Sequence, residues 1–91
     1  GYGVFSGQEV EWAKLRFTPY QAKWTSTETW HAEQKAYFEA DGSYVLEVPY
    51  SSDSELVMDI LRYGPNVEVL SPNHLREKVI AKLKSAVAQY I

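Results

Sequence analysis

Apolar and polar residues alternate along four stretches of the chain, and a repeat of two residues is typical of a strand with one buried face. The expected strands cover residues 9–17, 34–40, 43–48 and 67–70. Asp41-Gly42 separates the second strand from the third. Asp-Gly between alternating stretches predicts a two-residue hairpin turn in which both residues have positive φ. Pro49 is expected to end the third strand.

Three further stretches carry helix signals. Thr18 before Pro19 predicts an N-cap followed by a proline at the first helical position. Ser52 and Glu55 have the spacing of a capping box, in which a hydroxyl and a carboxylate satisfy the first free amides of a helix. The expected helices cover residues 19–25, 52–63 and the stretch that begins at Pro72.

The segment between the last two helices determines the architecture. Gly64 is expected to end one helix in a left-handed cap, and Pro65 prevents the helix from continuing. Ser71 is expected to cap the next helix and Pro72 to open it. Because the strand between them has almost no flanking loop, both helices must reach the sheet that contains it. The last helix is expected to be amphipathic along its whole length.

The resulting order is β-α-β-β-α-β with an added C-terminal helix, an α+β arrangement. Right-handed crossovers place the first two helices on one face of a four-stranded antiparallel sheet, which is the ferredoxin-like sandwich. Phe38 and Leu46 should then share a face. The expected core consists of Phe17, Phe38, Leu46, Ile60, Leu61, Val67, Val69 and Leu83.

Composition limits the function classes. Ninety-one residues with a net charge of −3 and no cysteine are consistent with one cytoplasmic domain that has neither disulfides nor thiolate metal sites. No apolar run reaches the length of about 20 residues that spans a bilayer, so we expect no membrane partner. The negative charge argues mildly against a nucleic-acid surface.

The sequence contains no strong catalytic motif. His31 and His74 lie far apart in sequence and outside zinc-ligand spacing, so no metal site is predicted. There is no Gly-x-Ser-x-Gly nucleophile motif and no phosphate-binding glycine loop. We therefore expect a protein that is not an enzyme and has no cofactor.

The outward face of the sheet is the first candidate surface. Aromatic and basic side chains are expected there, which resembles single-stranded RNA binders, but the third strand contributes Val45 and Glu47 rather than an aromatic side chain. This mixture favours a face that packs against another domain or protomer. The candidate packing or dimer residues are Trp12, Tyr37, Val45 and Leu70.

Arg76 is the second candidate, because it falls within the apolar stripe of the last helix, in its first turn. Such a cation is either a snorkelling side chain or a guanidinium that binds a carboxylate, with Glu68 the nearest in sequence, or an anionic ligand. His74 and Arg16 are further candidates for contact with an effector or a neighbouring domain.

Several short motifs follow one another along nearly the whole chain. They are Gly3-Val4-Phe5, Val10-Glu11-Trp12-Ala13-Lys14-Leu15-Arg16-Phe17, Trp30-His31-x-x-Gln34, Asp41-Gly42-Ser43, Glu55-Leu56, Gly64-x-x-Val67-Glu68-Val69-Leu70-x-Pro72-x-x-Leu75-Arg76 and Tyr90. In this order they resemble the C-terminal extension of bacterial transcription regulators that contain a WYL domain. Ala32 stands where that family often has proline after the Trp-His pair.

The resemblance implies a ferredoxin-like regulatory module that packs against the WYL domain of the same chain, helps the regulator form a homodimer and contributes to effector sensing. DNA is then contacted by a winged helix outside this sequence. Residues 1–8 are expected to be a linker from the WYL domain and residues 9–91 the extension domain. Two other classes remain open, a stand-alone small-ligand sensor and a single-stranded nucleic-acid binder.

Overall fold

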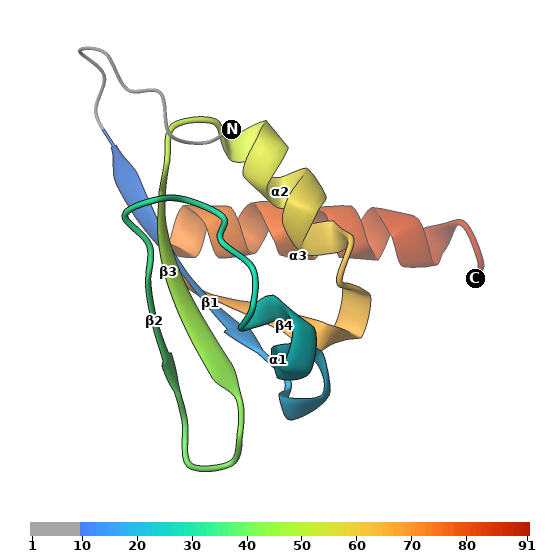
Figure 1. The fold of residues 1–91 in the computed structure, drawn as a ribbon. Coiled ribbons are helices and arrows are strands. Elements are labelled where there is room, and N and C mark those ends of the chain that lie inside the picture. The colour runs from blue at the N-terminus through green and yellow to red at the C-terminus, as the bar shows by residue number, and fades with distance from the viewer. Residues whose placement is uncertain (1–9) are drawn as a thin grey trace.

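A computed structural model of the chain describes residues 10–91 (Figure 1), so the expected linker, the Gly3-Val4-Phe5 motif and the expected start of the first strand at residue 9 lie outside the described part. The four strands pair antiparallel in the order β2-β3-β1-β4, which confirms the ferredoxin-like α+β architecture. The elements are β1 (Glu11–Phe17), α1 (Pro19–Thr25), β2 (Lys35–Phe38), β3 (Tyr44–Tyr50), α2 (Asp53–Leu61), a short 3₁₀ turn η1 (Gly64–Asn66), β4 (Val67–Ser71) and α3 (Asn73–Ala88).

The core lies on one side of the sheet. Side chains from β1, β3 and β4 on this side form a single buried cluster with side chains from α1, α2 and α3. The two crossover helices therefore share a face, as expected, and the start of α3 joins them there. The fully or almost fully buried members include Leu15, Phe17, Leu46, Leu56, Ile60, Val69 and Leu75.

Phe38 was expected in this core and is 60% exposed, so that prediction is wrong. The register is nevertheless as predicted, because Phe38 pairs with Tyr44 and Ala36 with Leu46, which puts Phe38 and Leu46 on the same face. The reason for the exposure is position. β2 is a four-residue edge strand whose residues are all exposed, although the Phe38 ring contacts Tyr44 at a centroid distance of 5.1 Å.

The hairpin forms at the predicted place with a different turn. Gly42 has a φ of 94°, and no residue other than glycine has positive φ in the described chain, so Asp41 does not adopt the expected conformation. The amide of Gly42 donates to the carbonyl of Glu39, and the amide of Glu39 donates to the carbonyl of Ser43. The connection is thus a three-residue loop in which only the glycine occupies a left-handed position.

Pro49 does not end β3, which continues to Tyr50, so this expectation was wrong. The paired part of β2 ends at Lys35, opposite Glu47. Beyond that point β3 has a strand neighbour on one side only, and a residue without an amide hydrogen is tolerated there.

The helix caps are mixed. Thr18 accepts a hydrogen bond from the amide of Gln21 at 3.3 Å, as expected of an N-cap. Ser52 occupies the N-cap position of α2 but makes no capping bond with its side chain, so the predicted capping box is absent. Ser71 belongs to β4 and Pro72 stands at the N-cap of α3, one residue later than predicted.

Gly64 has the predicted positive φ, 55°, although α2 already ends at Leu61 and Gly64 opens the 3₁₀ turn. Leu61 and Val67 were both expected in the core, but they are only partly buried and pack against its edge. No helix within residues 10–91 is long and apolar enough to cross a membrane.

The second half of α3 corrects another prediction. Leu75 and Val79 are buried, whereas every residue from 81 onward is exposed, including Leu83 at 41%. Figure 1 shows why, because this half of the helix extends past the sheet and past α2. Its apolar stripe therefore has no partner within the described chain.

Candidate functional site

The face of the sheet away from the helices, here called the open sheet face, carries two aromatic rings with a lysine over each. Trp12 on β1 is 40% exposed, and the Nζ atom of Lys35 lies 5.3 Å from its ring centroid. Tyr37 on β2 is 45% exposed, and the Nζ atom of Lys14 lies 5.9 Å from its centroid. Each lysine reaches across β3 to the ring on the other strand, so the register of the sheet sets both cation–π pairs.

Val45 and Leu70, the other two candidate packing residues, are less available than expected. Val45 lies on β3 between its strand partners Arg16 and Tyr37 and is fully buried, so it offers no contact area. Leu70 lies where the pairing of β1 with β4 shifts by one residue, and it is half-buried. The exposed apolar part of the open sheet face is therefore centred on Trp12 and Tyr37.

Charges of alternating sign form a network across neighbouring strands of the sheet, where Arg16 on β1 pairs with Glu68 on β4. The Nε and Nη2 atoms of Arg16 donate to the two carboxylate oxygens of Glu39 at 2.9 and 3.3 Å. Its Nη1 atom lies 3.5 Å from Glu68, whose other oxygen accepts a hydrogen bond from Arg76 at 3.0 Å. The hydrogen bond to Glu39, followed by the charge of that carboxylate, raises the pKa of Arg16. Two cations and two anions balance within this network.

Arg76 has the partner that the sequence indicated. Its Nη1 atom donates both to Glu68 and to the carbonyl of Val69, the latter at 2.8 Å. The guanidinium thus fastens the first turn of α3 to β4. Arg16 and Arg76 are brought together through Glu68, and both already have carboxylate partners.

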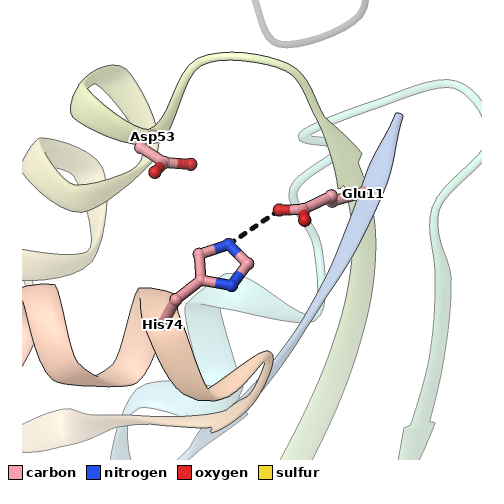
Figure 2. A group of neighbouring side chains, drawn as sticks. All are labelled: Glu11, Asp53 and His74. Atoms are coloured by element: carbon pink, nitrogen blue, oxygen red, sulfur yellow. Dashed lines mark hydrogen bonds and ion pairs between the residues drawn. The ribbon is translucent and has the colours of Figure 1, made fainter. Parts of the chain in front are cut away.

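His74, the third candidate contact residue, lies in a different group. Its Nε2 atom is 2.8 Å from Glu11 on β1, and the hydroxyl of Tyr50 donates to the same carboxylate oxygen at 2.9 Å. Asp53, at the start of α2, lies close by (Figure 2). Its carboxylate also forms an ion pair with Lys78. Burial, and then the hydrogen bond to Glu11, raises the pKa of Tyr50 far above its usual range.

A hollow of about 830 Å³ lies beside the outer side of α2. The rings of Trp30 and Tyr63 stack at a centroid distance of 5.9 Å, and the edge of Phe17 contacts both. Burial raises the pKa of the Tyr63 hydroxyl, and Glu28 adds to the effect. The lining residues are Glu28, Thr29, Trp30, Glu55, Met58, Asp59, Arg62 and Tyr63.

Sequence reasoning missed Glu39, Glu11 and Tyr50 as partners of the candidate residues. Glu39 is 23 positions from Arg16, and Glu11 is 63 positions from His74. The signal for Glu39 was present in the ferredoxin-like strand order, which puts the β2–β3 hairpin beside β1. No sequence signal singled out Glu11, because its contact depends on where α3 begins.

The comparisons with known proteins give one result. No curated protein matches the chain. The model of the WCX domain family matches residues 9–87, which include all the described strands and nearly all of α3. With the ferredoxin-like sheet and the added C-terminal helix already established, this match shows that the chain belongs to the WCX domain family.

Proposed function

We propose that this chain is a non-catalytic docking module of a bacterial transcription regulator, which packs through its open sheet face against the WYL domain of the same polypeptide. The family supports the general role, since the WCX domain is the regulatory C-terminal domain of WYL-type regulators. The specific surface is our inference from the side chains on the sheet.

The observation that carries the proposal is the pair Trp12 and Tyr37. Both rings remain about half-exposed on a face that no helix of the described chain covers. On the same face, the charge of Arg16 is already paired with Glu39 and Glu68, and the ammonium groups of Lys35 and Lys14 lie over the two rings. An apolar aromatic centre with a satisfied polar rim is the usual anatomy of a protein interface.

The test compares two exposed tryptophans in the complete regulator. Trp12→Ala removes a ring from the open sheet face, whereas Trp24→Ala removes a ring of similar exposure, 49%, from α1. We expect only Trp12→Ala to loosen the domain from its neighbour, seen as faster amide hydrogen exchange at the contact, and to weaken effector response. Equal behaviour of the two variants would contradict the proposed face.

We further propose that the complete regulator is a homodimer whose winged helix, outside this sequence, contacts DNA. The exposed stripe on α3, with Leu83, Val87 and Tyr90, supports self-association because monomers rarely expose such contiguous apolar surface. Sedimentation of the wild-type chain should show a dimer that Leu83→Lys weakens. Reading the gene upstream of residue 1 tests the linker at residues 1–8 and the expected WYL-coding region.

A second candidate function is small-ligand sensing by this domain itself, which the hollow beside α2 favours. Its aromatic wall and carboxylates suit a cationic ligand with an apolar part. Titration of the chain with small amines, followed by chemical shifts of Tyr63 and Met58, tests this function. Saturable shift changes that become smaller in Glu55→Gln would support the sensing function. The absence of saturable changes in the wild type would rule it out.

A further inference from the structure

We propose that Glu11, Asp53 and His74 form a binding site for a divalent transition-metal ion, with Zn²⁺ as the best-fitting example. One ligand atom from each residue lies within 4.8 Å of the others. Figure 2 shows that the three side chains come from three separate elements and converge on one space, Glu11 from β1, Asp53 from the first turn of α2 and His74 from the first turn of α3.

The donor set indicates the class of metal. An imidazole nitrogen with two carboxylate oxygens suits zinc and its neighbours, whereas Mg²⁺ and Ca²⁺ prefer oxygen alone. Zinc bonds of about 2.0–2.2 Å to N and O bring ligand atoms within about 3.5 Å of one another. His74 and Glu11 are already 2.8 Å apart, and all three ligand atoms lie within 4.8 Å of one another, so the set must contract to hold the ion. Glu11 and His74 are about half-exposed, which leaves their side chains room to move.

The buried hydroxyl of Tyr50 supports Glu11, one of the three proposed ligands. Tyr50 is 1% exposed, and its hydroxyl donates to the Glu11 oxygen that also contacts His74. Partners of this kind fix the orientation of a ligating carboxylate, and their loss weakens metal sites. Glu11 is therefore held in place from the core side by a hydroxyl that is not itself a proposed ligand.

Lys78 competes with a metal ion for the carboxylate of Asp53. Its ammonium group forms an ion pair with Asp53, and the lysine side chain is 54% exposed. A metal ion must displace this ammonium group from Asp53 and replace the hydrogen bond between His74 and Glu11. Removing the lysine charge should consequently strengthen metal binding, because Asp53 is then free to serve as a ligand.

The experiment is calorimetric titration of the 91-residue chain with ZnCl₂. We expect one site, with affinity reduced at least about tenfold in His74→Asn and in Glu11→Gln. Lys78→Gln should bind several-fold more tightly. His31→Asn, which removes the other histidine, should bind like the wild type. Zinc should also raise the melting temperature of the wild type but not of His74→Asn, because a ligand of the folded state stabilises it by mass action.

Circular dichroism of each variant establishes that it is folded before titration. If His74→Asn and His31→Asn lose zinc equally, or if Lys78→Gln binds no better than the wild type, the three-ligand site is wrong. Failure to detect saturable binding in the folded wild-type chain would also overturn it. None of these results depends on the WYL domain, so they leave the proposed docking function untouched.

Discussion

Arg76 shows how much one side chain contributes to the arrangement of this molecule. A single nitrogen of its guanidinium donates to a carboxylate and to a main-chain carbonyl, while the side chain remains 41% exposed. Exposed ion pairs contribute little on their own, but the bond to the Val69 carbonyl joins α3 to β4. We therefore expect a structural effect of modest size.

The first prediction concerns this pair. Arg76→Ala should lower the free energy of unfolding by about 0.5–1.5 kcal/mol, since a charge-assisted hydrogen bond and a weak ion pair are lost. Arg76→Lys should lower it by less. A double-mutant cycle with Glu68→Gln, measured by urea unfolding, separates the ion pair from the bond to the carbonyl. Unchanged stability in Arg76→Ala would reduce this residue to a surface cation.

Asp41 gives a pH-dependent prediction. The amide of Ser43 donates to Asp41, its hydroxyl donates as well, and together they hold the pKa of that carboxyl below the ordinary value of 3.8. A lowered pKa in the folded state means that the stabilisation is present above the ordinary value and disappears as the pH falls through the folded-state value.

Asp41→Ala should therefore unfold at lower urea concentration than the wild type at about pH 6, and the difference should shrink when the pH is lowered to about 2. Glu33→Ala, which removes an exposed carboxylate elsewhere, should match the wild type at both values. A difference for Asp41→Ala that persists in acid would show that the carboxylate charge is not its cause.

At the scale of single elements, the β2–β3 hairpin depends on one backbone conformation. Gly42 has a φ of 94°, and a Cβ atom there would meet Pro19 at an ordinary contact distance of 3.5 Å. The penalty for a side chain is thus conformational rather than steric. Gly42→Ala should cost about 1–2 kcal/mol in urea unfolding, and Gly42→Asn less, because asparagine tolerates positive φ better. Equal losses would point to a clash instead.

The two halves of α3 should differ in the same experiment. Leu75 is fully buried and Leu83 is 41% exposed. Leu75→Ala should cost about 2–5 kcal/mol because it leaves a cavity in the core. Leu83→Ala should stay within about 0.5 kcal/mol of the wild type at concentrations where the chain is monomeric. A large loss in Leu83→Ala would mean that the second half of the helix is packed in solution.

The sequence pattern predicted element types and faces well but not which faces are covered. Alternation assigned Phe38 and Leu46 to one side of the sheet correctly. It did not indicate that the seven-residue helix α1 leaves the edge strand β2 uncovered. In the same way, the four-residue spacing of Val79 and Leu83 identified an apolar stripe on α3. The spacing did not indicate that only Val79 is buried, because that depends on where the sheet ends.

At the scale of the whole molecule, contacts were predictable when the partners were close in sequence. Glu68 and Arg76 are eight positions apart, across one strand and one turn, and the pairing followed from that proximity. The group of Glu11, Asp53 and His74 requires the relative placement of β1, α2 and α3. Sequence rules for metal ligands rely on the spacing of residues within one short segment, so they did not indicate this group of three residues.

The outer edges of the sheet have one more consequence, for how the molecule behaves at high concentration. Unpaired strand edges invite pairing with other chains, and short or charged edge strands discourage it. β2 has only four residues and includes Lys35, while on β4 the bond from Arg76 occupies the Val69 carbonyl. The Arg76 guanidinium thus hinders the pairing of another strand with β4. The Arg76→Ala variant should therefore aggregate and become turbid on storage while it is still folded.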